Sequence, residues 1–240
     1  MKSRFPLWVS LLLNVFLLLC LWVIVQRLGG WNYTLSRLRH DEAGLYKSRK
    51  DLFERMPAQQ GAIIFLGDSQ TEQCEWQEFL QPDSAIILNR GIVGDYAAGV
   101  LARLDEIVRH KPSKIFLLVG INDLIFEKKP EDIAPVYRDI VASLRNKTPD
   151  SELFLQSIFP VNNTLKKIGV ENETIQQMNT EIARIAKDYA LPYLDIYSEL
   201  TDADGNLSPR FTNDGIHLNG MGYQVWKNAI HHSSFIIHHY

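Results

Sequence analysis

Beyond residue 60, hydrophobic and polar positions follow two alternating patterns along the chain. Short continuous apolar runs, typical of strands buried on both faces of a parallel sheet, alternate with stretches in which apolar residues recur every three or four positions, as in amphipathic helices. The apolar runs predict five strands, at 62–67, 84–91, 114–120, 152–160 and 191–197. The helical stretches lie at 97–110, 130–147, 173–190 and 220–239. Strands that alternate with helices favour a parallel sheet covered by helices on both faces.

The N-terminal end of the chain follows neither pattern. Residues 7–25 read LWVSLLLNVFLLLCLWVIV. As a helix this uncharged stretch would be about 28 Å long, close to the ~30 Å hydrocarbon core of a bilayer. Trp8 and Trp22 lie near its two ends, where aromatic rings favour the membrane interface. A cleaved signal peptide would need a shorter apolar region and a small-residue cleavage site, and a lipoprotein signal would need a small residue before Cys20. We therefore predict an uncleaved membrane anchor over residues 1–28.

The chain divides into three predicted parts. After the anchor, residues 29–60 are polar with an intermittent apolar stripe, which indicates a stalk or a packing helix. Residues 61–240 carry the whole α/β pattern as one domain. Basic residues flank both ends of the apolar stretch, so the positive-inside rule gives only a weak preference. A short basic start before a single span favours an internal N-terminus, which would place the domain in the periplasm or outside the cell.

Composition and charge exclude some classes of partner. Of the 240 residues, 46% are hydrophobic and 22% charged, which is ordinary for a globular protein with a buried core. The net charge of −3, without a local basic cluster, argues against a nucleic-acid partner. Cys20 lies in the anchor and Cys74 in the domain, so we expect no disulfide between them. Composition does not reveal the oligomeric state.

Histidines near the C-terminus raise the question of a metal site. They stand at 231, 232, 238 and 239. Metal sites usually combine histidines with carboxylates or thiolates at defined spacings, and the predicted terminal helix offers neither. We therefore predict a solvated tail and no bound metal.

Polar residues of catalytic type follow the carboxyl ends of four predicted strands. They are Asp68 and Ser69 after the first strand, Gly91 after the second, Asn122 after the third, and Asp214 and His217 beyond the fifth. In open α/β sheets, ligand groups gather outside the carboxyl ends of the strands. We therefore expect these residues to share one cleft.

This set of side chains suits acyl transfer. A serine hydroxyl needs a base before it can attack a carbonyl, and His217 is the candidate base for Ser69. Asp214, three residues earlier, could accept the His217 Nδ1–H and fix the imidazole tautomer. The resulting oxyanion needs donors, for which the N–H groups of Ser69 and Gly91 and the side-chain amide of Asn122 are candidates.

Each of these residues also has a purely structural interpretation. Serine and aspartate after a strand commonly cap a helix, and so does Asn122 with its neighbour. Asp214 and the glycine after it form a common turn, and a single histidine is usually a surface or core residue. Taken as a set, these structural interpretations are less convincing because all the residues are predicted at the same edge of the sheet.

The four blocks resemble those of the SGNH hydrolase superfamily, also called GDSL esterases and lipases. The Ser, Gly, Asn and His of that family correspond to Ser69 in GDSQ, Gly91 in NRGIVGD, Asn122 in GIND and His217 in DGIHL. The resemblance spans about residues 60–230 and is strongest to the branch of platelet-activating-factor acetylhydrolase-like and lysophospholipase-like esterases.

The resemblance implies a set of roles and a fold. Ser69 would be the nucleophile, His217 the base and Asp214 its orienting carboxylate, with Ser69, Gly91 and Asn122 lining the oxyanion hole and no metal or organic cofactor. The expected fold is a three-layer α/β/α, flavodoxin-like arrangement with a five-stranded parallel sheet, preceded by a transmembrane helix. Asp68 is expected to hold the turn. Gln70 stands where the family name has leucine, which leaves the substrate branch open.

The expected substrate is a small acyl ester, such as an O-acetyl group on a cell-surface glycan. The domain is compact, so we expect an open cleft, with the irregular segment 157–173 at its rim. A lysophospholipid or a thioester is the alternative, and an acyltransferase to a sugar hydroxyl would use the same residues. A non-catalytic anchored binding protein is the remaining class, for which the three residues Ser69, Asp214 and His217 need not align.

Overall fold

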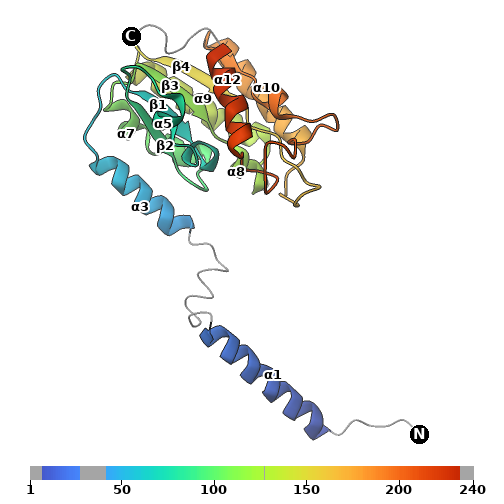
Figure 1. The fold of residues 1–240 in the computed structure, drawn as a ribbon. Coiled ribbons are helices and arrows are strands. Elements are labelled where there is room, and N and C mark those ends of the chain that lie inside the picture. Colours follow the sequence, from blue (N-terminus) through green and yellow to red (C-terminus); the bar gives the residue numbers. More distant parts are fainter. Residues whose placement is uncertain (1–6, 28–41, 127, 233–240) are drawn as a thin grey trace. The chain divides into compact units, whose positions relative to one another are not determined.

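The computed structural model describes residues 7–27, 42–126 and 128–232. The chain divides into two compact units, Met1–Leu45 and Tyr46–Tyr240. The second unit is built on a parallel sheet of five strands in the order β2-β1-β3-β4-β5 (Figure 1). The strands are β1 (Ile63–Gly67), β2 (Ile87–Gly91), β3 (Lys114–Leu118), β4 (Glu152–Gln156) and β5 (Tyr193–Leu194).

Helices cover both faces of this sheet. One face is covered by α6 (Ala97–Leu101), α7 (Leu104–Val108), α9 (Pro130–Lys147) and α10 (Asn172–Asp188). The other is covered by α5 (Trp76–Leu80), α11 (Tyr197–Leu200) and α12 (Gly220–His232). The three-layer α/β/α prediction is confirmed, and the strand order is the flavodoxin-like one.

Strands contribute side chains to the apolar cores on both sides of the sheet because successive side chains point to opposite faces. In β1, Ile64 and Leu66 lie in the core beneath α6, α7, α9 and α10, whereas Ile63 and Phe65 lie in the core beneath α5 and α12. In the latter core, the rings of Trp76, Phe65, Phe116 and Phe154 stack in a row with centroids between 3.9 and 4.8 Å apart. Two-sided burial explains the continuous apolar runs in the sequence.

Several strands are shorter than predicted, and two predicted elements differ more from the structure. The stretch 97–110 forms two short helices, α6 and α7, because the chain leaves helical geometry at Arg103, whose side chain is buried. The fifth strand is confined to Tyr193–Leu194, the edge of the sheet, where only β4 offers backbone partners. Two further short helices, α4 (Ser69–Glu72) and α8 (Ile121–Ile125), begin directly after β1 and β3.

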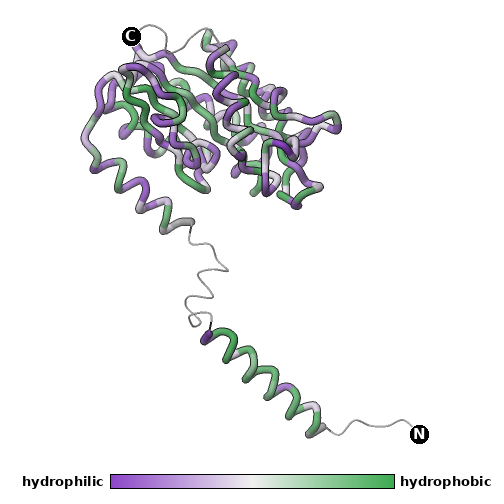
Figure 2. Tube along the Cα trace, in the orientation of Figure 1, coloured by the Kyte–Doolittle hydropathy of each residue, from purple (hydrophilic) through white to green (hydrophobic). Residues whose placement is uncertain are grey.

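The first unit contains one long helix, α1 (Leu7–Arg27), which is apolar along nearly its whole length (Figure 2). Within the described residues it is the one helix long and apolar enough to cross a membrane, over Val9–Arg27. Its leucines are largely exposed around the helix, so it has no single buried face. These properties fit a signal anchor or a span.

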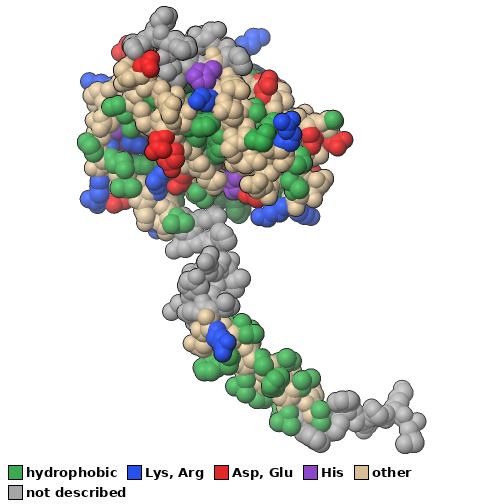
Figure 3. Space-filling view, in the orientation of Figure 1, with side chains coloured by type: hydrophobic (Ala, Val, Ile, Leu, Met, Phe, Trp, Pro, Cys, Tyr) green, Lys and Arg blue, Asp and Glu red, His purple; other side chains and the backbone are tan. Residues whose placement is uncertain are grey.

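Helix α3 (Glu42–Arg55) falls in the segment expected to be a stalk or a packing helix. From Tyr46 onward it belongs to the second unit, and its Phe53 side chain is buried there, with an exposed fraction of 3%. On the face of the second unit shown in Figure 3, charged side chains of both signs are interspersed. Histidines 238 and 239 lie outside the described residues.

Candidate active site

The turn after β1 presents Ser69 at the first position of α4. Asp68 is the N-cap of this helix, and its Oδ1 accepts the backbone N–H of Gln70 at 3.0 Å. Gly67 ends the strand at a position where a Cβ atom would fall 2.1 Å from the Leu118 carbonyl oxygen, so only glycine fits there. The predicted turn-holding role of Asp68 is confirmed, and the same turn places Ser69 at the carboxyl edge of the sheet.

The side chains of Ser69, His217 and Asp214 align in the order expected for acyl transfer. The Ser69 Oγ lies 3.2 Å from His217 Nε2, and His217 Nδ1 lies 2.7 Å from Asp214 Oδ2. The other carboxylate oxygen accepts the backbone N–H groups of His217 at 2.8 Å and Ile216 at 3.0 Å. With the carboxylate accepting from Nδ1, the imidazole presents Nε2 as an acceptor toward the serine hydroxyl.

Asp214 is held as a carboxylate. Partial burial acts to raise the pKa of this group, but the hydrogen bonds from the His217 side chain and from the His217 and Ile216 backbone outweigh it and hold the pKa at about 2. An ionised Asp214 can therefore stabilise an imidazolium at His217 throughout the neutral pH range.

The loop that carries the histidine is tied to the serine turn by Gln70. The Gln70 Nε2 donates to the Ile216 carbonyl oxygen at 2.6 Å, one residue before His217, and the Gln70 carbonyl oxygen accepts the Tyr223 hydroxyl at 2.8 Å. Gln70 is buried, and its Oε1 has no hydrogen-bond partner among the residues that the structure describes. Gln70, which stands where the GDSL family name has leucine, therefore connects the serine turn to the histidine loop.

Gly91 does not present a free donor. Its N–H donates to Asn89 Oδ1 at 2.9 Å, and a Cβ atom at this position would fall 2.2 Å from the Glu72 backbone nitrogen. This glycine is required for the close approach of β2 to α4. The expectation that the Gly91 N–H serves the oxyanion is not supported by this geometry, because a neighbouring side chain already satisfies that group.

Among the described residues, a second glycine of the same sequence block, Gly94, has the unoccupied N–H donor that was expected of Gly91. Gly94 lies in the turn Ile92–Asp95, which is closed by the Asp95 N–H donating to the Ile92 carbonyl at 3.1 Å. Its φ of +74° is one that L side chains rarely adopt. Among the described residues, no group accepts the N–H of Gly94 or of Ser69.

Asn122 places its amide beside this turn. Its Nδ2 donates one hydrogen to the Asp95 carbonyl oxygen at 2.9 Å, which leaves the second hydrogen available. Of the residues that sequence reasoning proposed, Asn122 after β3 therefore contacts the turn after β2, through the Asp95 carbonyl rather than through Gly91.

A buried ion pair beneath the site was missed at the sequence level. Arg103 Nε lies 2.8 Å from Asp95 Oδ2, and both side chains are almost fully buried. The same guanidinium donates to the carbonyl oxygens of Gly67 at 3.0 Å and Arg90 at 2.9 Å. Arg103 thus ties together the ends of β1 and β2. The arginine eight residues after Asp95, on an otherwise apolar helical face, is the only signal that could have revealed it.

Three carboxylates lie close to the serine turn. Burial raises the pKa of the Asp68 carboxyl to about 7, and the nearby Asp95 and Asp123 carboxylates act in the same direction. The Asp68 Oδ2 is buried and has no hydrogen-bond partner within the described part of the chain. Ionisation of the Asp68 carboxyl therefore lowers the stability of the folded chain.

The segment predicted at the cleft rim contacts the histidine loop. The Asn162 N–H donates to the Gly215 carbonyl at 2.7 Å, and a Cβ at Gly215 would lie 3.7 Å from the Leu165 Cβ. Gly215 itself has φ +86°. Segment 157–173 therefore supports the turn that holds Asp214 and His217.

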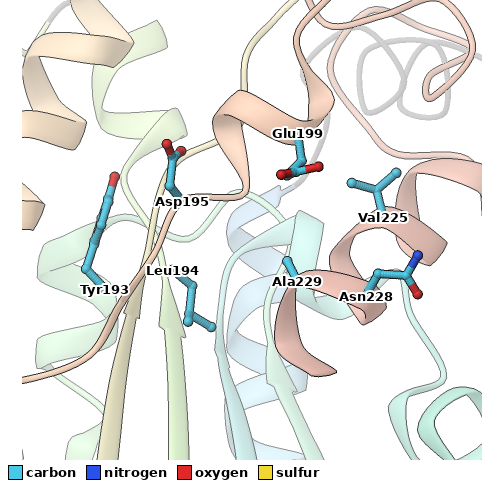
Figure 4. A pocket seen from close by; sticks show the side chains of 7 residues that line it. All are labelled: Tyr193, Leu194, Asp195, Glu199, Val225, Asn228 and Ala229. Carbon is cyan, nitrogen blue, oxygen red and sulfur yellow. The ribbon is translucent and has the colours of Figure 1, made fainter. Parts of the chain in front are cut away.

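Surface cavities also lie outside this group. The cavity in Figure 4 lies beside β5, α11 and α12 and contains none of the predicted catalytic residues. Its lining residues are Tyr193, Leu194, Asp195, Glu199, Val225, Asn228 and Ala229. A second groove is lined by Cys74, Phe79 and Tyr223, among others, and Tyr223 connects it to Gln70. Within the described residues, no cluster of His, Cys, Asp and Glu could hold a metal ion.

Comparisons with known proteins identify the family of the chain. Residues 65–225 match the GDSL-like Lipase/Acylhydrolase family. The platelet-activating factor acetylhydrolase IB subunit alpha2 of Rattus norvegicus is 27% identical over 176 residues, which cover 70% of this chain and 74% of the relative.

Solved structures show the same fold. A structure from Streptococcus pneumonia named for platelet activating factor is 28% identical with a TM-score of 0.72, covering 85% of this chain and 97% of the other. A GDSL-like lipase from Bacteroides thetaiotaomicron, 20% identical, has a TM-score of 0.66 and covers 78% of this chain and 96% of its own. The chain therefore belongs to the GDSL-like lipase/acylhydrolase family, within the SGNH hydrolases, and is an ester-hydrolysing enzyme.

Proposed function

We propose that this enzyme hydrolyses a small acyl ester through a Ser69–His217–Asp214 triad. The observation that carries the proposal is the unbroken line of contacts from the Ser69 Oγ to the Asp214 carboxylate. His217 Nε2 takes the hydroxyl proton as Ser69 attacks the acyl carbonyl, and then gives it to the departing alcohol. Water, activated by the same imidazole, releases the acyl group from Ser69.

The oxyanion of the tetrahedral intermediate needs donors that are already in place. We assign this role to the N–H groups of Ser69 and Gly94 and to the free amide hydrogen of Asn122. Gly94 replaces Gly91 in this set because its N–H has no partner in the described part of the chain, whereas the Gly91 N–H is bound by Asn89.

A short acyl group on a bulky alcohol is the substrate that the site supports best. The relatives named acetylhydrolases support a short acyl chain. The side chains of His217 and Asp214 are 31% and 42% exposed, so the reaction centre is open to an alcohol of any size, including an O-acetylated glycan at the cell surface.

A lysophospholipase or thioesterase is the second candidate. The same acetylhydrolase relatives fit it equally well. The groove lined by Cys74, Phe79 and Tyr223 would offer apolar surface to a longer chain, and Tyr223 reaches the serine turn through Gln70. An acyltransferase to a sugar hydroxyl would use the same triad and differ only in the acceptor.

Two measurements test the proposal. A fluorophosphonate probe is expected to label the wild-type chain and not Ser69→Ala; equal labelling of both would show that Ser69 is not the nucleophile. Rates on nitrophenyl acetate, butyrate and longer esters are expected to fall with chain length, and a preference for long chains would favour the lysophospholipase alternative. Products analysed with an added sugar acceptor separate hydrolysis from acyl transfer.

A further inference from the structure

We propose that Glu72, paired with Arg49 of α3, is a positioning residue for the turn that presents the Gly94 N–H. Helix α3 would then be part of the catalytic unit rather than a spacer. The inference rests on the proposed function, because it gives Gly94 a role in stabilising the oxyanion.

The Glu72 carboxylate holds the turn directly. Its Oε2 accepts the backbone N–H of Val93, the residue before Gly94, at 2.5 Å. Glycine lacks a Cβ and samples a wider range of backbone conformations than other residues. The direction of the Gly94 N–H therefore depends on what holds its neighbours: Glu72 holds Val93 on one side, and Asn122 holds the Asp95 carbonyl on the other.

Glu72 is itself rigidly placed relative to the nucleophile. It is the last residue of α4, three positions after Ser69, and its backbone N–H donates to the Asp68 carbonyl at 2.9 Å. Its own carbonyl accepts Asn89 Nδ2 at 2.9 Å. The carboxylate thus relates the turn after β2 to the helix that carries Ser69.

Arg49 supplies the opposite charge to this carboxylate. The Arg49 Nε lies 3.4 Å from Glu72 Oε1, and the two side chains are 33% and 23% exposed. Arg49 also stacks on the Phe53 ring, with its guanidinium carbon 4.9 Å from the ring centroid. Without this cation, a partly exposed carboxylate would be free to turn toward water instead of the Val93 N–H.

Contacts at two points along α3 hold Arg49 in place. The Tyr46 hydroxyl donates to the Gly99 carbonyl oxygen at 3.3 Å. Phe53 is buried, Arg90 packs on its ring at 4.6 Å, and its carbonyl accepts Arg109 Nη2 at 2.6 Å. The pairing of Arg49 with Glu72 is therefore built into the docking of α3.

The test uses full-length variants assayed on nitrophenyl acetate. We expect Glu72→Ala to lower kcat about 10- to 100-fold with KM changed less than about threefold, because it displaces an oxyanion donor without touching the ground state. Arg49→Met is expected to lower kcat about three- to tenfold by the same route, with no further loss in the double variant. Glu72→Gln, which keeps an oxygen for the Val93 N–H, is expected to recover most of the loss.

Matched controls lie on the same helix. Arg55→Met and Glu54→Gln alter exposed side chains of α3 whose ion pairs in the described part of the chain are with their helical neighbours Asp51 and Lys50, and both are expected to keep wild-type kcat. The midpoint of thermal unfolding and the fraction of chains that the fluorophosphonate probe labels at saturation are measured for every variant.

The outcomes separate this inference from the proposed function. If wild type labels at Ser69 but Arg49→Met and Glu72→Ala react with the probe and the ester as fast as wild type, the positioning role is wrong and the triad stands. If kcat falls only in proportion to the labelled fraction, Glu72 is merely structural and the inference is again wrong. If wild type does not label at Ser69, the proposed function itself fails.

Discussion

At the residue scale, Gln70 has the most specific role in the site. Its side-chain amide donates to the Ile216 carbonyl, and this hydrogen bond links the turn that carries Ser69 to the loop that carries His217. Its backbone carbonyl is bound by Tyr223 of α12. The position after the serine thus sets the distance between Ser69 and His217.

Replacing Gln70 by leucine removes the donor to the partly buried Ile216 carbonyl. We expect a loss of about 1–3 kcal/mol in the free energy of unfolding. We also expect kcat to fall about tenfold, because His217 is less well placed for proton transfer. Urea unfolding and steady-state kinetics measure the two effects. Gln177→Leu, at an exposed position of α10, serves as control, and an unchanged kcat in Gln70→Leu would contradict the assignment.

Asn122→Ala tests the oxyanion donors. We expect kcat/KM to fall about 100- to 1000-fold, the usual effect of removing one such donor. Ser69 should remain present and reactive, so the fluorophosphonate probe should still label the variant, only more slowly. A variant with wild-type kcat/KM would remove Asn122 from the mechanism.

The buried Asp68 carboxyl makes stability depend on pH. Its pKa of about 7 in the folded chain lies above the ordinary value of about 4, so the folded state keeps a proton that the unfolded state has lost. Stability from this group is therefore full below about pH 4 and is lost as pH rises to about 7.

Asp68→Asn keeps the helix cap and cannot ionise. We expect its stability relative to wild type to rise by about 2–4 kcal/mol between pH 4 and pH 8, measured by urea unfolding at each pH. Asp139→Asn, exposed on α9, should show no such trend. A pH-independent difference between Asp68→Asn and wild type would show that Asp68 is ionised across the range.

At the scale of elements, the strands are more predictable than the helices around them. Strand β1 is buried over its whole length, and β3 and β4 are buried at all but their first residue, because both faces of the sheet are covered, and this leaves a clear apolar pattern. The break between α6 and α7 leaves none, because the apolar spacing continues through Arg103. The sequence also does not distinguish Gly91 from Gly94 as the candidate oxyanion donor, since this depends on whether the Asn89 side chain folds back onto its own strand.

The break between α6 and α7 is stabilised by a buried ion pair. We expect Arg103→Met to cost about 3–5 kcal/mol in unfolding free energy, because it leaves the Asp95 carboxylate buried without its partner. Denaturant unfolding measures this loss. Arg184→Met removes an exposed pair on α10 and should change stability by less than about 1 kcal/mol. Equal effects of the two substitutions would contradict the structural role of Arg103.

At the scale of the whole molecule, the long apolar helix α1 bears on where the enzyme works. We propose that it is an uncleaved anchor with the catalytic domain in the periplasm or outside the cell. A C-terminal reporter that is active only outside the cytoplasm should then give a signal. An expressed fusion that gives no signal would show the opposite orientation. A chain in the membrane fraction that is shortened at its N-terminus would show that the segment is cleaved.

The strand order has a consequence for how such an enzyme can change its substrate. After β1 the chain leaves toward the layer of α5 and α12, whereas after β3 it leaves toward the layer of α8 and α9, so the two loops diverge at adjacent strand ends. This is the topological switch point of the fold, and Ser69 and Asn122 are the residues that flank it. Connectivity alone therefore fixes the place of the nucleophile, whereas part of the segment after β4 lies outside the triad and is left to vary. Substitutions or insertions in residues 163–168 are therefore expected to change acyl or alcohol preference without disturbing the nucleophile.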